Sequence, residues 1–574
     1  MVAALGIGAV LAMAAMTADL LAECEAIWQV TEERERQRAA QRLEPPEVGI
    51  YDGEMRPQGW LDAAYLGDFE WVDNDTGAGI TEIPWDHYLA QWIWDEHGRI
   101  KRGEKRVVVI VVECRNGARW SGRLDSVSAE KREDGSKVLV VEWLSDYETV
   151  KWYTVWSNPF LPSILQFPRV FMLAGGARWC LLTALHLQVM REQQNWWNLP
   201  DDPMDPGSWV PADVAEWSVV VKPHSFADDL ADGILWCLLT SRFKSWHNVA
   251  APILADAELS LTWRRYMPDL GDEQPIPGMA LRPGALVIDI VDKSGYYNQG
   301  TSNGGTLWDG LIRTVASFVA PFIDPVVQEI ADIDEPTYKI PGLLGTSKTT
   351  PYVVWLEGEE TGIQSSKNKR WPSKGVQVLV GGHSAYGVNE AISASIQLSF
   401  DLLSAALFVP ALGGTADRLL SVLYTDTVLS WMNVKSLARS QTDGWVGYFE
   451  YFQDGADRAF TIESLLVLRA GFWATRTKFA AEVNVADGSP WVIGDQGRGH
   501  CWVGDRVGFG ILGDRTGRIH VDRIKSIRLR YSDSEPLSWI PVIGDNSEDK
   551  DPAVRAIERL EGVFSALHDL GVFS

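Results

Sequence analysis

Two turn-forming dipeptides divide three valine-rich runs between residues 104 and 146. The runs read VVVIVVECR, ARWSGRLDSVS and KVLVVEWLS, and the dipeptides are Asn116-Gly117 and Asp134-Gly135. Asn-Gly and Asp-Gly tolerate the positive φ angles of tight hairpin turns, and runs rich in Val favour strands. The pattern therefore predicts a three-stranded antiparallel meander, which is the most constrained local structure in the chain.

A cluster of acidic residues, Asp73, Asp75 and Glu82, lies just before this meander, in FEWVDNDTGAGITEIPWDHYLAQWI (69–93). An EF-hand calcium loop counted from Asp73 would need a bidentate Glu at position 12, where this chain has Pro84. The stretch instead predicts a turn, a short strand and a helix that Pro84 begins. One face of that helix would carry Trp85, Tyr88, Leu89, Trp92 and Ile93.

Between about residues 157 and 345 the sequence pattern changes from strand signals to apolar runs with helical spacing. The runs are ARWCLLTALHLQVM, FADDLADGILWCLLTSRF and TLWDGLIRTVASFVAPFI, and EWSVVVK and ALVIDIVD predict short strands between them. Strand signals return at PYVVWLE and GVQVLVGG and again over 475–530, where GDRTGR predicts a hairpin turn. A long apolar helix, NEAISASIQLSFDLLSAALF, interrupts this region, and PAVRAIERLEGVFSALHDL predicts a terminal helix.

The N-terminal segment MVAALGIGAVLAMAAMTADLL has the apolar character of a signal peptide or a membrane span. It lacks the Lys/Arg start of a signal peptide, and Asp19 ends the apolar run early for a span. Glu32 and Arg36 are spaced for a helical ion pair, as are Glu35 and Arg38, and Pro45-Pro46 ends the pattern. We therefore expect one long helix across about residues 5–43, and no membrane insertion.

These elements predict an α+β protein with two strand-rich, tube-like β-barrel or sandwich modules, a helical middle region and terminal helices. The predicted divisions are an N-terminal helix (1–45), a first tube-like β module (46–156), a helix-rich middle domain (157–345), a second β module with long helices (346–533) and a C-terminal helical segment (534–574).

The net charge and the cysteine spacing argue against nucleic-acid binding, a disulfide framework and a zinc site. The formal net charge is −25, which disfavours binding to nucleic acid because such binding surfaces are basic. The five cysteines are far apart in sequence, and no Cys/His cluster has the spacing of a zinc site. Neither a disulfide framework nor a metal is expected, and the cysteines are interpreted as small buried apolar residues.

Ser384, in VQVLVGGHSAYG, resembles the nucleophile elbow of α/β-hydrolases, in which a strand, a serine and a helix follow one another. That motif requires a small residue two positions after the serine, and this chain has Tyr386 there. The strained turn of the elbow does not accommodate a tyrosine, and no alternating β/α scaffold surrounds it. We expect Ser384 not to be catalytic.

Other candidate catalytic residues also lack the spacing that chemistry needs. His87 and His97 are ten residues apart, which does not place them on one helical face. The pairs Asp201-Asp202 and Asp228-Asp229 are adjacent, so their side chains diverge rather than form an acid dyad. The sequence therefore predicts no catalytic, cofactor-binding or metal-binding residue.

The chain contains 27 Trp residues, and such side chains stack on sugars in carbohydrate-binding proteins. Most lie within predicted strands or helices, where burial is expected; they include Trp120, Trp143, Trp179, Trp236 and Trp308. Trp196-Trp197, in the loop-like NWWNLPDD, is the pair that could anchor a ligand or a partner.

Four blocks in the C-terminal part resemble, in order, a family of minor tail proteins from long-tailed phages of actinobacteria, assigned to the tail hub. The blocks are VQVLVGGHSAYGVNEAISASIQLSFDLLSAA, DGWVGYFEYFQDGADRAFTIESLLVLRAGFWATR, VADGSPWVIGDQGRGHCWVGDRVGF and SEPLSWIPVIGDN. WVDNDTGAGITEIPWDHYLAQWI is similar to an early block of such proteins, and the meander follows in the expected place. The blocks span most of residues 65–570.

The resemblance implies a homotrimeric ring at the distal end of the tail tube, in the virion, assembled in the host cytoplasm. Two tube-like modules in each of three chains would give a pseudo-sixfold ring around the DNA channel. Implied partners are distal tail and tube proteins, the tape measure protein and other minor tail proteins, with DNA passing through without specific binding. The family has no catalytic constellation or cofactor to transfer to this chain.

Two other classes stay open. A tail-associated cell-wall hydrolase would need an acid dyad, a Cys/His pair or a zinc site, none of which the motifs provide. A receptor- or carbohydrate-binding tip protein would be favoured if exposed Trp residues gather at one end of the molecule.

Overall fold

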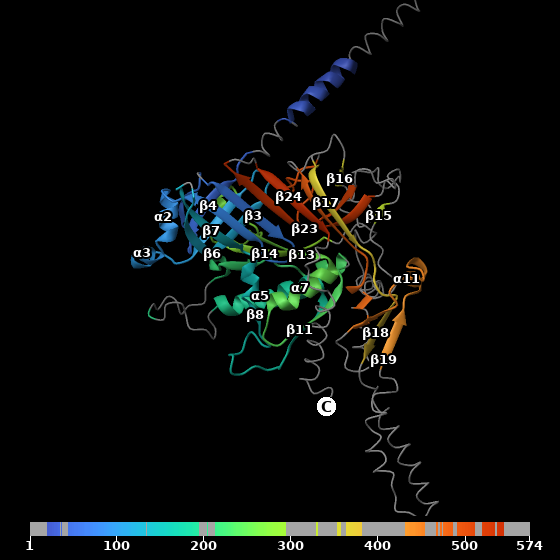
Figure 1. Cartoon of the computed structure of the whole chain (residues 1–574). Helices are drawn as coiled ribbons and strands as arrows, with labels where there is room; N and C mark the ends of the chain where they lie inside the picture. The colour runs from blue at the N-terminus through green and yellow to red at the C-terminus, as the bar shows by residue number, and fades with distance from the viewer. Residues whose placement is uncertain are drawn as a thin grey trace, which may run out of the picture.

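The strand signals between residues 47 and 145 form one half of a large sheet (Figure 1). Its strands are β1 (Glu47–Asp52), β2 (Pro57–Trp60), β3 (Leu66–Val72), β4 (Ala78–Pro84), β5 (Val108–Glu113), β6 (Arg119–Lys131) and β7 (Lys137–Ser145). The predicted meander is confirmed, because β5 pairs with β6 and β6 with β7, all antiparallel. Gly117 and Gly135 turn between them with φ of 82° and 88°, which a side chain would disfavour.

The computed structural model describes residues 20–34, 36, 44–62, 64–133, 135–194, 204, 213–232, 234–293, 329–330, 353–357, 363–381, 431–453, 467–468, 471–472, 474–485, 491–510, 519–533 and 537–544.

Strands from the C-terminal part form the other half of the same sheet. They are β15 (Glu329–Ile330), β16 (Val354–Leu356), β17 (Ile363–Trp371), β21 (Lys478–Val485), β22 (Arg506–Gly510), β23 (Ile519–Ser532) and β24 (Ser538–Gly544). The antiparallel pairing of β22 with β23 reaches Gly510 and Ile519, as the predicted hairpin around GDRTGR requires. The order along the main path is β17-β21-β24-β23-β3-β4-β7-β6-β5-β1-β2.

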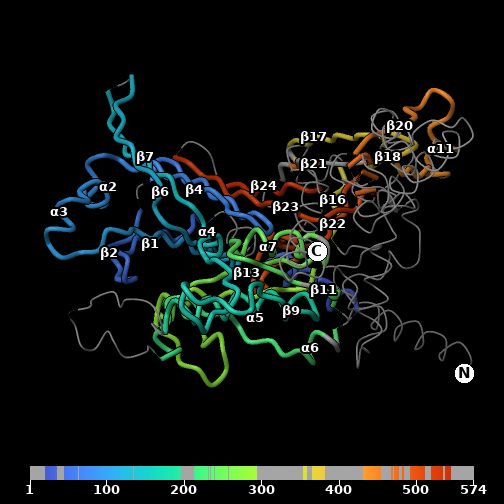
Figure 2. The backbone as a smooth tube through the Cα atoms, turned by 90° about the horizontal axis from the view of Figure 1, so that it is seen from below, coloured from blue at the N-terminus to red at the C-terminus, as the bar shows by residue number. Residues whose placement is uncertain are grey.

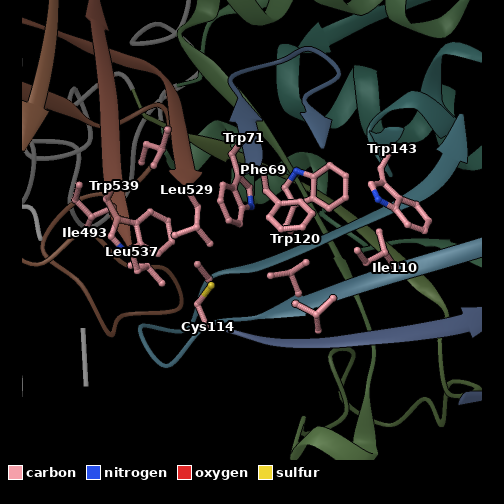
Figure 3. Packing of buried hydrophobic residues seen from close by; sticks show 14 of the residues in the cluster. Phe69, Trp71, Ile110, Cys114, Trp120, Trp143, Ile493, Leu529, Leu537 and Trp539 are labelled. Carbon is pink, nitrogen blue, oxygen red and sulfur yellow. The ribbon is translucent and has the colours of Figure 1, made fainter. Parts of the chain in front are cut away.

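The two halves meet where β3 pairs antiparallel with β23, from Leu66 opposite Ser532 to Val72 opposite Ser526. A shared aromatic core lies under this seam (Figure 3). The Trp71 ring of the first half stacks on the Trp539 ring of the second, with centroids 5.7 Å apart. The two strand-rich regions therefore share one sheet and one core.

The aromatic run after β4 is helical, but it begins later than predicted. Pro84 is the last residue of β4, and α2 spans Tyr88–Trp94, followed by α3 (Glu96–Lys101). His87 caps α2 by accepting a hydrogen bond from the Leu89 N–H at Nδ1. Pro84 is not the start of the helix, because its backbone continues the β4 pairing with Val138 of β7.

The middle region has its own core, built from helices and small sheets. Its elements are α4 (Glu148–Lys151), β8 (Thr154–Val155), β9 (Phe171–Gly176), α5 (Ala177–Gln193), β10 (Val219–Val221), α6 (Phe226–Ala231), β11 (Trp236–Ser241), β12 (Lys244–Ser245), α7 (Trp246–Ala257), β13 (Leu259–Arg265) and β14 (Leu286–Asp292). The predictions of α5, β10 and β14 are confirmed.

The predicted helix over residues 226–243 is wrong in its second half. Only α6 is helical, and the following apolar stretch is strand β11, which pairs antiparallel with β9. A short apolar run is compatible with either a buried strand or a helix. Here the run is a strand because β9 pairs with it. The predicted helix around 306–323 lies outside the described residues.

A small module projects from the β17–β21 pair at the edge of the large sheet (Figures 1 and 2). It contains β18 (Gln377–Gly381), β19 (Trp431–Lys435), α11 (Leu437–Thr442) and β20 (Glu450–Phe452). The buried guanidinium of Arg439 donates to the Phe472 carbonyl over 2.9 Å and to Thr475 Oγ1 over 2.8 Å. Arg439 thereby holds α11 to the base of the module.

Residues 20–34 form an exposed helix that extends away from the body of the molecule (Figure 1). The predicted Glu32–Arg36 ion pair is present, at 2.5 Å. The rest of the predicted helix over 5–43 lies outside the described residues, as do the long apolar helix at 389–408 and the terminal helix. Within the described ranges, no helix has the length and apolar character needed to cross a membrane. The strand-rich α+β class is confirmed.

Candidate functional site: a buried joint and two exposed ends

The acidic turn between β3 and β4 joins three regions of the chain. Asp73 accepts a hydrogen bond at Oδ2 from Arg523 Nη2 of β23, over 2.9 Å. Its other oxygen accepts from the Ser260 hydroxyl of β13, over 2.7 Å. Both ionised side chains are almost fully buried, with exposures of 3% for Asp73 and 8% for Arg523. Asp73 therefore ties the first half of the sheet to the second half and to the middle region.

The next two residues of the turn bind the middle region. Asn74, with a positive φ of 58°, donates through Nδ2 to the Leu259 carbonyl and accepts at Oδ1 from the Leu261 N–H. The Asn74 side-chain amide thus makes the donor and acceptor contacts with the β13 backbone that a paired strand would make. Asp75 pairs with Lys151 of α4 at 2.8 Å, in a more exposed position.

A second buried joint centres on Arg119, at the start of β6. Its guanidinium forms ion pairs with Glu113 and with Asp272, and Nη1 also donates to the Arg265 carbonyl over 2.7 Å. Nearby, Arg265 makes a two-pronged ion pair with Asp146, both contacts at 2.6 Å. Buried charges are stable only when paired in this way, so these contacts fix the middle region against the sheet.

Electrostatics at this joint follow from burial and pairing together. Burial lowers the pKa of Arg119, but hydrogen bonds to Asp272 and Glu113 outweigh it and raise the pKa above its usual value. Burial raises the pKa of Asp272, but the Arg119 hydrogen bond, the Met267 N–H and nearby guanidinium charges bring it below its usual range. Both groups therefore stay ionised.

The acidic turn is consequently a structural joint between three regions of the chain. Its carboxylates face cations of the same chain, and the described residues contain no group of three or more His, Cys, Asp or Glu that could hold a metal ion. Sequence inspection identified the turn but missed its role, since Arg523 and Ser260 are 450 and 187 residues away from Asp73.

The other candidate residues are not brought together. His87 caps α2, and His97 lies on α3. Asp229 is buried and accepts from Arg178 Nε and the Trp179 N–H. Asp228 accepts from the Ser225 N–H at Oδ2, and the Ser225 hydroxyl caps α6 by accepting from the Asp228 N–H. The Asp228 and Asp229 side chains thus have separate structural partners, as the sequence indicated. Ser384, Asp201-Asp202 and Trp196-Trp197 lie outside the described residues.

Burial accounts for part of the tryptophan and cysteine content. Trp120 and Trp143 are buried, while Trp179 and Trp236 are partly buried; Trp308 lies outside the described residues. Cys114, Cys180 and Cys501 are buried, and burial raises the pKa of the Cys114 and Cys501 thiols. The interpretation of the cysteines as buried apolar residues is wrong for Cys24, which is exposed on the N-terminal helix, and Cys237 is only partly buried.

Large apolar side chains are exposed on several elements, among them α2–α3 and α11, which lie at opposite ends of the molecule (Figures 1 and 2). One set lies on β2, α2 and α3: Trp60, Tyr88, Trp94 and Ile100. The other set lies on α11 and the loop that follows it: Leu437, Trp445, Val446, Tyr448 and Phe449. The N-terminal helix exposes a third set: Leu20, Leu21, Ile27, Trp28 and Val30.

Comparison with known proteins identifies the class as a tail component of a long-tailed bacteriophage. The chain belongs to the family described as Siphovirus ReqiPepy6 Gp37-like protein, whose model matches residues 47–545. It is 32% identical to "Minor tail protein Gp28" of Mycobacterium phage L5, over 96% of this chain and 98% of the relative. The protein of the same name from Mycobacterium phage D29 is also 32% identical, over 96% and 99% of the two chains. The chain is therefore a minor tail protein of the virion.

Solved structures give more distant likenesses. A tail protein from Neisseria meningitidis MC58 has 10% identity and a TM-score of 0.36, over 89% of this chain and 99% of that one. A 43 kDa tail protein of prophage MuSo2 from Shewanella oneidensis has 10% identity and a TM-score of 0.38, with the same coverages. TM-scores below 0.5 do not establish a common fold.

Proposed function

We propose that this minor tail protein forms a homotrimeric hub ring that joins the tail tube to the distal tip and surrounds the DNA channel. The observation that carries the proposal is the pairing of β3 with β23, which places two strand-rich halves side by side in one sheet. Three such chains would present six strand-rich halves around an axis. That number would match a sixfold tube.

The domain division belongs to the same proposal. The segments 46–156 and 346–533 would act as the two tube-like modules, with β15 and β24 completing the second from outside its predicted bounds. The segment 157–345 would act as a middle domain with its own core, to which Tyr147, Val150 and Val155 also contribute. The helix before residue 45 would bind a neighbouring tail protein or copy. The buried joints at Asp73 and Arg119 would keep each pair of modules rigid while the ring carries load.

The partners follow from this position. Distal tail and tube proteins, the tape measure protein and other minor tail proteins would contact the ring, and DNA would pass through without specific binding. A cell-wall hydrolase would need a catalytic group, and the candidates His87, Asp228 and Asp229 have structural partners instead. A receptor-binding tip remains the second candidate, because Trp445 and Tyr448 are exposed together at one end.

Imaging of intact particles tests the proposal. Electron cryomicroscopy of the tail tip should locate this chain as a ring of three copies at the end of the tube, with a central channel. A single copy, or copies placed on side fibres away from the axis, would refute the hub and favour the receptor-binding candidate.

A further inference from the structure

Two cysteines that are far apart in the sequence meet in the middle region. Cys180 lies in the first turn of α5, and Cys237 is the second residue of β11. Both are free thiols, and their side chains are in hydrogen-bonding contact. The wide spacing of the cysteines in the sequence gives no sign of this contact, which the fold alone creates.

The backbone around the two cysteines holds them together. β11 pairs antiparallel with β9, and Cys237 lies opposite Gly175. Since β9 leads directly into α5, the helix begins beside β11, where the Ala177 N–H donates to the Leu235 carbonyl over 2.8 Å. Residues opposite each other on paired strands project to the same face of the sheet. A Cβ added at Gly175 would lie 3.3 Å from the Trp179 ring, so the Cys237 side chain is on the face that the first turn of α5 covers.

The two thiols differ in their access to solvent. Cys180 is fully buried, whereas Cys237 is partly exposed and packs at the margin of the middle-region core. The hydrogen bond to Cys237 raises the pKa of the Cys180 thiol, and burial and the Asp229 carboxylate raise it further. The thiolate is the form that attacks a disulfide, so Cys180 reacts slowly. A small oxidant in solution therefore meets the pair through Cys237.

We propose that Cys180 and Cys237 form a disulfide once the virion has left the host cell. The cytoplasm keeps thiols reduced, whereas disulfides form and persist in the oxidising medium outside cells. A tail protein passes from the first environment to the second when particles are released. The oxidant is a low-molecular-weight disulfide, such as oxidised glutathione. This inference does not depend on the proposed ring.

The bond forms in two thiol–disulfide exchanges. In the first, the Cys237 sulfur attacks the small disulfide, a mixed disulfide forms on Cys237, and the proton of its thiol passes to the small thiolate that leaves. In the second, the Cys180 sulfur attacks the Cys237 sulfur, and its proton passes to the second small thiolate. The two cysteines are thereby oxidised by two electrons, and the small disulfide is reduced by the same two.

The disulfide ties the start of α5 to β11 and thus fixes the helix to the sheet on which it packs. Sulfurs already in contact need only a small movement to reach the bonded distance of about 2.05 Å. Such a cross-link restricts the unfolded chain, so the oxidised middle region should be more stable than the reduced one. Released particles gain this stability where no chaperone or new synthesis can repair the tail.

Peptide mapping of the wild-type protein tests the proposal. Free thiols are alkylated under denaturing conditions in infected cells and in particles purified from the medium, and both samples are digested without reduction. Trypsin places Cys180 in peptide 179–191 and Cys237 in peptide 192–242. In released particles the two peptides should be joined, and in infected cells they should be separate and alkylated. Alkylated Cys180 and Cys237 in released particles would overturn the proposal, as would a small thiol retained on Cys237 or a joined pair inside infected cells.

The buried cysteines of the large sheet supply the internal control for this mapping. Cys114 and Cys501 are in the sheet core and should be alkylated in both samples. A joined Cys114–Cys501 pair in released particles would contradict the assignment of the disulfide to the middle region.

Mass spectrometry of the purified full chain tests the order of the two exchanges. In a Cys24→Ser background, which removes the exposed thiol of the N-terminal helix, oxidised glutathione should make the chain lighter by the mass of two hydrogen atoms. Added Cys180→Ala should instead leave one glutathione trapped on Cys237, and added Cys237→Ala should leave the mass unchanged. The matched control Cys114→Ala should behave as the background does.

The melting temperature of the same samples gives a second readout. Oxidation should raise it in the background and in the Cys114→Ala control, and a reducing agent should reverse the change. Neither Cys180→Ala nor Cys237→Ala should show the difference, and circular dichroism verifies that each variant is folded. An unchanged mass of the background, or a loss of two hydrogen atoms from either variant of the pair, would contradict the proposal. The hub would survive that result, because imaging of the tail tip tests it separately.

Discussion

Asp73 and Arg523 are 450 residues apart in sequence, yet the carboxylate of one accepts a hydrogen bond from the guanidinium of the other over 2.9 Å. Both side chains are buried at the point where the two halves of the sheet and the middle region meet. A charge buried in such a place depends on its partner, so this contact is a sensitive point for stability.

Replacing Asp73 with Ala should lower the free energy of unfolding by about 3–5 kcal/mol, because the buried Arg523 loses its counter-charge. The matched control is Asp75→Ala, two residues away, which removes a more exposed ion pair, with side-chain exposures of 55% for Asp75 and 29% for Lys151, and should cost about 0–1 kcal/mol. Urea denaturation followed by tryptophan fluorescence measures both. Equal losses in the two variants would show that burial of the Asp73–Arg523 pair does not matter.

Acid should weaken the joint at Arg119. The pKa of Asp272 is depressed in the folded protein, so its contribution to stability is complete above the unfolded pKa of about 3.9 and is lost as the pH falls through the folded value. Asp272→Asn should therefore lower the melting temperature at pH 7, and its difference from wild type should shrink below pH 4. The exposed pair of Glu96 and Arg106 supplies the control, Glu96→Gln. A difference that does not depend on pH would contradict the assignment.

The exposed N-terminal helix should serve assembly and not folding. Ile27→Ser with Trp28→Ser changes two exposed apolar residues of that helix, so the melting temperature of the chain should stay unchanged. Incorporation into particles should fall sharply, because the apolar face would no longer bind its partner. Glu25→Ser with Gln29→Ser, on the same helix, controls for loss of helix propensity. Normal incorporation of the apolar double variant would refute the assignment.

Cell-wall lysis by intact particles should not depend on Ser384, His87 or His97, the candidate catalytic residues considered from sequence motifs. Ser384→Ala, and His87→Gln together with His97→Gln, should leave lysis unchanged in particles of normal morphology. A zone-clearing assay on host cell walls measures this. Lost lysis with normal particles would replace the structural assignment with an enzymatic one.

The wall of the proposed channel should be net acidic, because lysines and arginines facing DNA would add salt-dependent affinity along its path. Three copies of a −25 chain carry a formal charge of −75. The basic stretches at 367–370 and 523–530 should lie off the channel, and two arginines of the second stretch, Arg523 and Arg528, already face Asp73 and Asp68. The surface potential of a solved ring decides this. A neutral or basic wall would leave solubility as the explanation of the charge.

Local signals in the sequence predicted local structure well. The meander rests on turn chemistry at Gly117 and Gly135 and on runs of valine, and both act over a few residues. The same kind of reasoning placed the β22–β23 hairpin and helix α5. Their formation needs no information from distant parts of the chain.

Predictions were wrong or incomplete where the structure or role of a segment depends on residues that are far away in sequence. The apolar stretch at 236–241 became a strand because β9 lies beside it, and Pro84 stayed in a strand because β7 does. The role of Asp73 could not be derived, since nothing near it in sequence points to Arg523. The exposed loop at 445–449 was also missed, because strand-like aromatic residues are usually buried and only the fold shows that these are not.

The seam between β3 and β23 also sets when this protein can finish folding. Asp68 and Arg528, which face each other across the seam, are 460 residues apart, and ribosomes add ~5–20 residues per second. One edge of β3 thus waits roughly 20 to 90 seconds for its partner strand to be synthesised. During that time it is an open template for pairing with other nascent chains. Completion of the sheet therefore has to wait until β23 has been synthesised, and any truncation before residue 519 leaves that edge permanently open.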